Sequence, residues 1–174
     1  MKIRVLNGGH AIIAYPAALA GVEYVHDAMN VPEIEAFLRK VILDDVAPNV
    51  KPVGDQTPQA YMAQTIKRFN NPGVADTIAR LCLDGANRQP KFIVPSIRDR
   101  LAAGHTPYGL ALCCAFWCLY RVGVDDQGQM IPIGTHCLLR PKPQKMIRWS
   151  GLNRRISMAT FASPKISVRR SRQP

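Results

Sequence analysis

After Met1 the chain begins with the segment Lys2-Ile3-Arg4-Val5-Leu6-Asn7-Gly8-Gly9-His10, which the apolar residues 11–14 follow directly. An α-helix turns by about 100° per residue, so Lys2, Asn7 and His10 would share one face of such a helix. The apolar residues beside that face can anchor the helix in a core. The stretch therefore predicts a helix that begins near the start of the chain, bends at Pro16 and ends near Leu19.

The three polar side chains are an amine, a carboxamide and an imidazole, a set that suits the oxidation of an alcohol. An amine that accepts a hydroxyl proton must first be unprotonated, which requires a pKa lowered by burial or by nearby cations. Asn7 and His10 could then hold the developing alkoxide or neighbouring hydroxyls without adding charge. The alternative is structural, with Lys2 as a solvated residue near a chain end and His10 as an ordinary, partly buried histidine. The spacing alone favours this alternative, because three polar residues often share a helix face.

Helical patterns recur along the chain, and strand patterns do not. A proline opens several of the apolar-periodic segments, as is typical of a first helical turn. We expect loops at 48–58 and 123–128 and a turn at Asp84-Gly85. The segment 108–120 is apolar nearly all round, which indicates a central buried helix. The sequence thus predicts an all-α, multi-helical domain, whose further helices cover residues 22–29, 32–42, 58–69, 74–83, 95–104 and 108–120.

The chain has 174 residues and a net charge of +11, and this charge is concentrated at its end. Residues 1–134 hold 13 Lys and Arg together with all 12 acidic residues, whereas residues 135–174 hold 10 Lys and Arg and no acid. We therefore divide the chain into a near-neutral domain, 1–134, and a basic tail, 135–174, which its composition predicts to be disordered. The alternative for the tail is an arm that binds nucleic acid or other polyanions non-specifically.

The five cysteines predict neither a metal site nor a disulfide framework. They stand at 82, 113, 114, 118 and 137, and no His or acidic residue flanks Cys114 and Cys118 at ligand spacing. We therefore expect no metal, and buried thiols in a reducing compartment. The sequence has no signal-peptide pattern, and no apolar run reaches the roughly 18 residues that a membrane span needs. These features predict a cytoplasmic protein without membrane association.

A series of short motifs extends from the first stretch to about Ile133. After residues 2–10 come Tyr15, Glu23-Tyr24-Val25-His26, Arg68-Phe69-Asn70-Asn71-Pro72, Asp76, Arg80, Asp84-Gly85-Ala86-Asn87-Arg88-Gln89-Pro90 and Pro95. In order and spacing these motifs resemble the C-terminal domain of the mannitol dehydrogenase family, the long-chain, metal-independent polyol dehydrogenases and hexuronate reductases. The resemblance implies an all-α domain similar to that of the 6-phosphogluconate dehydrogenase-like group.

The resemblance also implies roles for five residues. The Lys that matches Lys2 is the general acid/base, the Asn that matches Asn7 polarises the reacting oxygen, and the His that matches His10 contacts substrate hydroxyls. Arg80 and Arg88 match substrate contacts, although position 88 is more usually Lys, which keeps the charge but not the geometry. The implied substrate is a polyol such as mannitol with its ketose, such as fructose. We favour it over fructuronate or tagaturonate because Arg88-Gln-Pro-Lys-Phe-Ile-Val-Pro95 resembles the mannitol branch more closely.

The implied cofactor is NAD or NADP, which the family holds mainly in an N-terminal dinucleotide-binding domain. This sequence has no Gly-x-Gly-x-x-Gly turn, and nothing in it identifies cofactor-binding residues. We therefore expect the C-terminal part of an enzyme, truncated at its start and altered by a shifted frame or an unrelated extension beyond about Ile133. In such a chain Lys2 is expected to be exposed, and the chain alone to be inactive. The alternative is a non-catalytic remnant whose tail binds polyanions.

Overall fold

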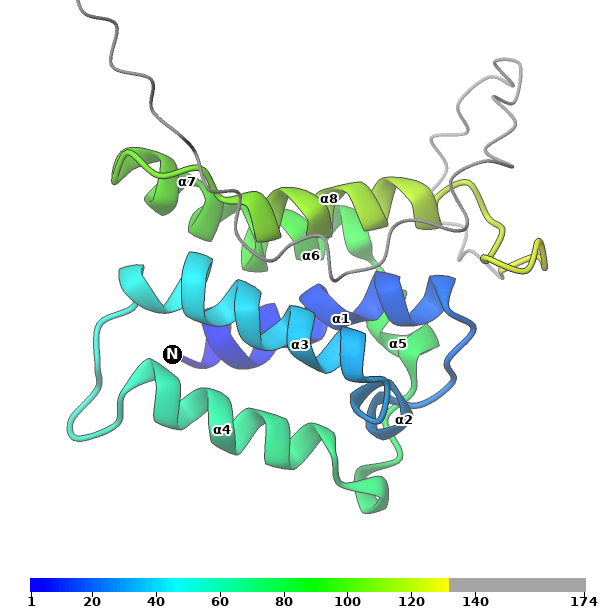
Figure 1. The fold of residues 1–174 in the computed structure, drawn as a ribbon, viewed down its shortest axis with the longest axis horizontal. Helices are drawn as coiled ribbons and strands as arrows, with labels where there is room; N and C mark the ends of the chain where they lie inside the picture. The colour runs from blue at the N-terminus through cyan, green and yellow to red at the C-terminus, as the bar shows by residue number, and fades with distance from the viewer. Residues whose placement is uncertain (132–174) are drawn as a thin grey trace, which may run out of the picture. The chain divides into compact units, whose positions relative to one another are not determined.

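The computed structural model describes residues 1–131, all of which belong to the first of two compact units of the chain, Met1–Leu139. This part is helical and contains no strand, which confirms the expected all-α class (Figure 1). The basic tail and the boundary near Ile133 lie outside the described residues. The α-helices are α1 (Gly8–Leu19), α2 (Val25–Met29), α3 (Pro32–Val41), α4 (Pro58–Phe69), α5 (Ile78–Cys82), α6 (Gly85–Phe92), α7 (Val94–Ala102) and α8 (Tyr108–Tyr120). Four further helical segments are the π-helices η1 (Lys2–Asn7) and η2 (Ile42–Val46) and the 3₁₀ turns η3 (Ala47–Asn49) and η4 (Pro72–Val74).

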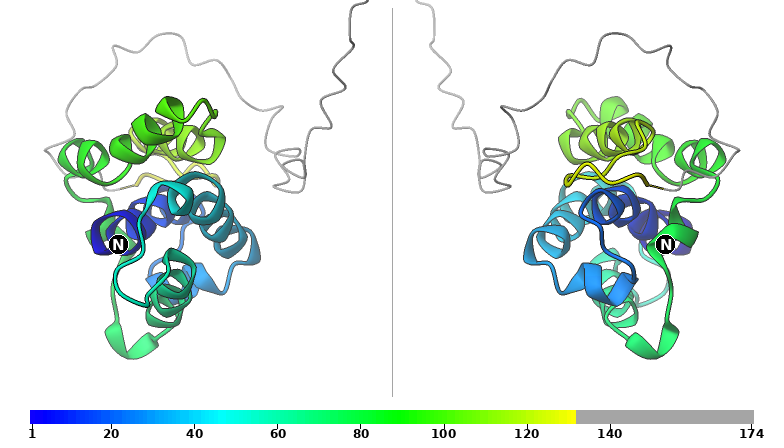
Figure 2. Two further views of the ribbon diagram at one scale, coloured as in Figure 1. Left: turned by 90° about the vertical axis from the view of Figure 1, so that its left-hand side faces the viewer. Right: turned by 90° about the vertical axis from the view of Figure 1, so that its right-hand side faces the viewer.

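Helix α1 forms the centre of this unit. Ten of its 12 residues are buried, because it packs against α3, α5, α6 and α8. Helix α8 lies on one side of α1 and α4 lies on the other (Figures 1 and 2). The polar residue His10 is therefore carried by the most enclosed helix of the described chain.

Two predicted helix starts are confirmed at the level of individual groups. Pro32 occupies the first turn of α3, where its missing N–H leaves no hydrogen bond unmade. At the start of α4, Thr57 accepts a hydrogen bond from the backbone N–H of Ala60 at 3.1 Å, and Pro58 follows it. Both helices then bury one apolar face, as the spacing of their apolar residues predicts.

The prediction that 108–120 forms the central buried helix is wrong. Of the residues of α8, only Leu110, Cys113 and Tyr120 are buried, whereas Tyr108 and Leu119 are 67% and 49% exposed. Helix α8 packs mainly against α1, with further contacts to α3, η2 and α7. A helix that is apolar on every side carries no pattern that shows which face, or how many faces, its neighbours cover.

The prediction of one helix over 74–83 is also wrong. Ala75 adopts a left-handed conformation, with φ at +47°, and Thr77 is extended, so η4 ends before α5 begins. The side chain of Thr77 then accepts from the N–H of Arg80 and caps α5. Asp84, with φ at +59°, makes the expected turn, but a helix that was not predicted, α6, follows it in spite of Pro90.

Candidate functional site

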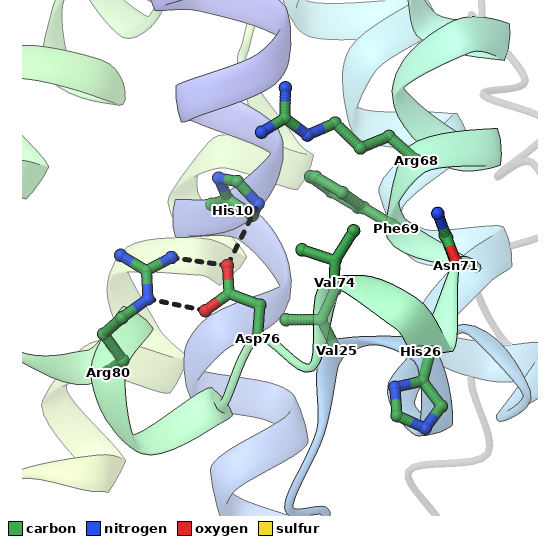
Figure 3. Close-up of a pocket in the computed structure, with 9 residues that line it drawn as sticks. All are labelled: His10, Val25, His26, Arg68, Phe69, Asn71, Val74, Asp76 and Arg80. Carbon is green, nitrogen blue, oxygen red and sulfur yellow. Dashed lines mark hydrogen bonds and ion pairs between the residues drawn. The ribbon is translucent and has the colours of Figure 1, made fainter.

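A small cavity of about 80 Å³ lies beside α1, where α1, α2, α4 and the segment before α5 meet. It combines two imidazoles, two guanidiniums and one carboxylate with apolar side chains, and Figure 3 shows how these groups face one another. Its lining residues are His10, Val25, His26, Arg68, Phe69, Asn71, Val74, Asp76 and Arg80.

His10 reaches this cavity from the first turn of α1. Its ring stacks on the Phe69 ring with centroids 4.3 Å apart, and its side chain is only 15% exposed. Burial lowers the pKa of His10 to about 4, and the positive charges of Arg80, Arg88 and Arg68 act in the same direction, against the opposing effect of Asp76. The ring is therefore neutral near pH 7, with one nitrogen able to donate a hydrogen bond and the other able to accept one.

Asp76 lies between His10 and Arg80 in the lining of the cavity (Figure 3). Its carboxylate accepts from Arg80 Nε at 2.5 Å and from Arg80 Nη2, and it lies 4.0 Å from His10 Nε2 (Figure 3). The hydrogen bonds from Arg80 hold the pKa of Asp76 below its ordinary value, so this carboxylate is charged near pH 7. The negative charge of Asp76 also balances the positive charge of Arg80. The hydrogens on Arg80 Nη1 are not used in this ion pair.

The backbone around Asp76 is held by a partner far away in sequence. The N–H of Val25 donates to the carbonyl of Asp76 at 2.9 Å, and the N–H of Ile78 donates to the carbonyl of Glu23 at 2.8 Å. This antiparallel bridge fixes the extended residues between η4 and α5 against the loop that enters α2. The carboxylate is thus placed by tertiary contacts and not by a helix.

Lys2 and Asn7 do not line this cavity. Lys2 is exposed, which confirms that expectation, and Asn7 is half-buried. The two residues lie on η1, where the N–H of Gly8 bonds to the carbonyl of Ile3, five residues earlier. In such a helix residues i and i+5 fall on nearly the same side, as i and i+4 do in an α-helix, so η1 brings Lys2 and Asn7 closer to one face than an α-helix would.

Arg88 is likewise not part of the cavity lining. Its Nη1 donates to the carbonyl of Leu81 at 2.9 Å, and its guanidinium lies 5.8 Å from the centroid of the Phe92 ring. It acts on His10 only through its charge. Of the five predicted site residues, the structure therefore brings together His10 and Arg80.

Four polar residues of the cavity lining were not predicted as site residues, namely His26, Arg68, Asn71 and Asp76. All four lie within motifs of the sequence resemblance, yet no role was assigned to them. The one local signal for Asp76 is an acid four residues before Arg80, a spacing that is common for exposed helix pairs. That spacing does not reveal that the carboxylate also faces a histidine on α1.

No group of three or more His, Cys, Asp or Glu side chains in residues 1–131 is placed to hold a metal ion. The four cysteines of this part are free thiols. Cys82 and Cys113 are buried, as expected, whereas Cys118 is exposed, so the expectation of buried thiols is wrong there. Burial raises the pKa of the Cys82 thiol to about 12, so it stays protonated and unreactive. Among the same residues, no helix has the length and apolar character to cross a membrane.

This chain is similar in sequence to several proteins that are named mannitol dehydrogenases. The mannitol 2-dehydrogenase of Cereibacter sphaeroides is 56% identical over 131 residues, which make up 75% of this chain and 28% of that protein. Mannitol dehydrogenase 2 of Saccharomyces cerevisiae is 39% identical over 134 residues, 76% of this chain and 27% of that protein. This chain therefore spans a little over a quarter of the length of these relatives.

Solved structures agree with this similarity. The ternary complex of Pseudomonas fluorescens mannitol 2-dehydrogenase with NAD and D-mannitol matches with a TM-score of 0.74 and 38% identity, over 79% of this chain and 29% of that one. A D-sorbitol dehydrogenase in substrate-free form matches with a TM-score of 0.72 and 29% identity, over 74% of this chain and 27% of that one.

The sequence pattern of the mannitol dehydrogenase C-terminal domain matches residues 1–167, which extends past Ile133. Since this match covers nearly the whole chain, and the helical fold and the motifs around His10 and Arg80 accompany it, the chain belongs to the mannitol dehydrogenase family and carries its C-terminal domain.

Proposed function

We propose that this chain is the substrate-handling part of an NAD- or NADP-dependent oxidoreductase that interconverts a polyol such as mannitol and its ketose, such as fructose. The observation that carries the proposal is a cavity lined both by neutral His10 and by Arg80, whose positive charge Asp76 balances. Uncharged hydroxyls suit such a lining, because they can both donate and accept hydrogen bonds.

The proposed division of labour follows from the chemistry of each side chain. Lys2 takes the proton of the reacting hydroxyl, and the amide of Asn7 donates to the developing alkoxide. His10, Arg80 and Arg88 hold the remaining hydroxyls. Since Lys2 is exposed in this chain, its part in the reaction requires that another portion of the enzyme cover it.

The described residues do not fit a dinucleotide. Residues 1–131 contain no strand, and therefore no glycine-rich turn between a strand and a helix that could bind a pyrophosphate. We therefore assign polyol binding and proton transfer to the described residues, and we expect the chain alone not to transfer hydride.

The charge of the cavity bears on the choice of substrate. Asp76 cancels the charge of one guanidinium, which favours a neutral polyol over an anion. Arg68 adds a second guanidinium to the lining. Because this positive charge could bind a carboxylate, fructuronate and tagaturonate stay the alternative substrates.

The test is an assay of NADH formation at about 340 nm, with mannitol and NAD, on the chain alone and after addition of the dinucleotide-binding portion of a mannitol 2-dehydrogenase. We expect turnover only in the mixture, and a loss of roughly 100-fold or more in the Lys2→Ala variant. The matched control is Lys40→Ala, which removes an exposed lysine paired with Asp44 on the surface and should leave the rate unchanged. Full activity of Lys2→Ala in the mixture would refute the assignment of Lys2. In the reverse direction, oxidation of NADH with fructuronate but not with fructose would move the substrate to the hexuronate class.

A further inference from the structure

The residue that connects the two proposed substrate contacts is Asp76. It comes from the extended segment before α5, Arg80 from α5 itself, and His10 from α1. Its side chain is 13% exposed, whereas that of Arg80 is 56% exposed. A mostly buried carboxylate that holds a mostly exposed guanidinium sets the position of the longer and more mobile side chain.

The geometry leaves the binding atoms of both partners available. Arg80 uses Nε and Nη2 on Asp76, so the two hydrogens on Nη1 remain for a ligand. The distance of 4.0 Å between Asp76 and His10 Nε2 is longer than a hydrogen bond, so the carboxylate acts on the imidazole through its charge. Asp76 is itself anchored by the hydrogen bond from Val25 to its carbonyl.

We propose that Asp76 is a positioning residue of the polyol site, which fixes the guanidinium of Arg80 beside the cavity and acts on the neighbouring His10 only through its charge, without contacting the reacting atoms. This inference rests on the proposed function for the identity of the ligand. In this proposal Asp76 does not bind the substrate itself, but it sets the position of a residue that does. The cavity lining also contains the guanidinium of Arg68 and the imidazole of His26, and neither makes one of the contacts of Asp76 described above.

The positioning can be measured in the chain without any cofactor. In ¹H–¹⁵N spectra, an Arg80 Nε–H held by a carboxylate exchanges slowly with water and gives a resolved signal, which the Arg80→Lys variant identifies. The isosteric Asp76→Asn variant should lose this signal. It should also lower the pKa of His10 below its wild-type value, since the opposing negative charge is removed.

The matched control is Glu35→Gln. Glu35 accepts from both Nε and Nη2 of Arg39, also four residues away, on helix α3 and outside the cavity lining. This variant should remove the Arg39 Nε–H signal and leave the signals of Arg80 and His10 unchanged. An Arg80 signal and a His10 pKa that are unaltered in Asp76→Asn would overturn the proposal.

The consequence for binding is tested by titrating D-mannitol into the same proteins and following the amide signals. We expect the dissociation constant to rise by about tenfold or more in Asp76→Asn and to stay unchanged in Glu35→Gln. In the Arg80→Gln background, the further effect of Asp76→Asn should largely disappear, because Asp76 acts through Arg80. Equal losses in both backgrounds would show that Asp76 only supports the fold, and would overturn the positioning role.

The two hypotheses fail in different ways. A wild-type chain that gives the expected Arg80 and His10 signals but no response to mannitol would refute polyol binding by this chain, and would leave the placement of Arg80 by Asp76 as a purely structural fact. A chain that binds mannitol equally well with Asp76→Asn would refute the positioning role and leave the proposed function standing.

Discussion

At the scale of single residues, His10 shows how burial sets chemistry. The ring lies between Phe69 on α4 and the charged groups of α5, and it loses its hydration there. Its pKa therefore falls from 6.5 to about 4. A histidine of this kind does not act as a cation at neutral pH, and its place in a polyol site is that of a neutral hydrogen-bonding group.

This shift predicts how the stability of the chain depends on pH. Above pH 6.5 the ring is neutral in both states, so its titration adds nothing to the free energy of unfolding. As the pH falls to about 4, the unfolded chain takes up the proton first, and the folded chain loses up to about 3 kcal/mol.

The measurement compares urea unfolding at pH 7 and pH 4.5 for the wild type and His10→Gln. The variant should lose less stability on acidification than the wild type does. His105→Gln, which alters an exposed histidine, should behave like the wild type. A wild-type loss that persists in His10→Gln would show that another group causes it.

Gly109 illustrates a second effect at the residue scale, the close approach of two helices. A Cβ atom at this position would lie 2.7 Å from Cγ2 of Val41 and 2.9 Å from Oδ2 of Asp45. Gly109→Ala should therefore lower the free energy of unfolding by about 1–3 kcal/mol through overpacking. Ala115→Ser on the exposed side of α8 is the control and should change it by less than about 0.5 kcal/mol. Thermal unfolding of both variants measures the difference, and a fully stable Gly109→Ala would mean that α8 can move away from η2.

At the scale of elements, α8 depends on a carboxylate from another part of the chain. Asp45 in η2 is 4% exposed, and its Oδ2 accepts from the backbone N–H of Leu110 at 3.0 Å. It thereby satisfies a donor at the start of α8, where no residue within the helix can do so. Its burial raises its pKa, while the hydrogen bonds from the start of α8 and the charge of Arg100 oppose that effect.

Replacing Asp45 separates its two roles as hydrogen-bond acceptor and as charge. Asp45→Ala should cost about 1–3 kcal/mol, because it leaves a buried N–H without a partner. Asp45→Asn keeps an acceptor oxygen and should cost less. Denaturant unfolding of the two variants checks this order, and an Asn variant as unstable as the Ala variant would show that the negative charge is what matters.

The π-helix η1 is the element that most affects the proposed catalytic face. An i→i+5 turn needs one more residue than an α-turn, and it changes the direction of every side chain before it. Lys2 and Asn7 are brought toward one side by this turn, whereas His10 follows on the regular helix α1. Neither Lys2 nor Asn7, however, lines the cavity that His10 enters.

At the scale of the whole molecule, the distribution of charge predicts a property of the complete chain. Residues 135–174 carry 10 of the 23 basic residues and no acidic residue. The 174-residue chain should bind heparin with an affinity that falls steeply with salt, whereas a chain ending at residue 134 should pass through the same column at low salt. A shortened chain that still binds would place the polyanion site in the helical domain.

Much of the helical architecture was predictable because its signals are local. Pro32, and Thr57 followed by Pro58, begin helices for reasons contained within one turn. The failures have causes that lie outside the segments concerned. Ala75 turns left-handed where the bridge between Tyr24 and Thr77 holds the chain extended, and nothing in residues 74–83 signals that bridge.

The all-α class, the main helix starts, the family and the candidates His10 and Arg80 could be predicted from the amino-acid sequence, since they depend on spacing, turn chemistry and motif order. The folded chain was needed to see that α1 and not α8 is central, that η1 is a π-helix, and that Asp76 lies between His10 and Arg80. The physical reason is that burial and long-range pairing are properties of what packs against a segment, and the residues of α1, α2, α4 and α5 meet only after the chain has folded.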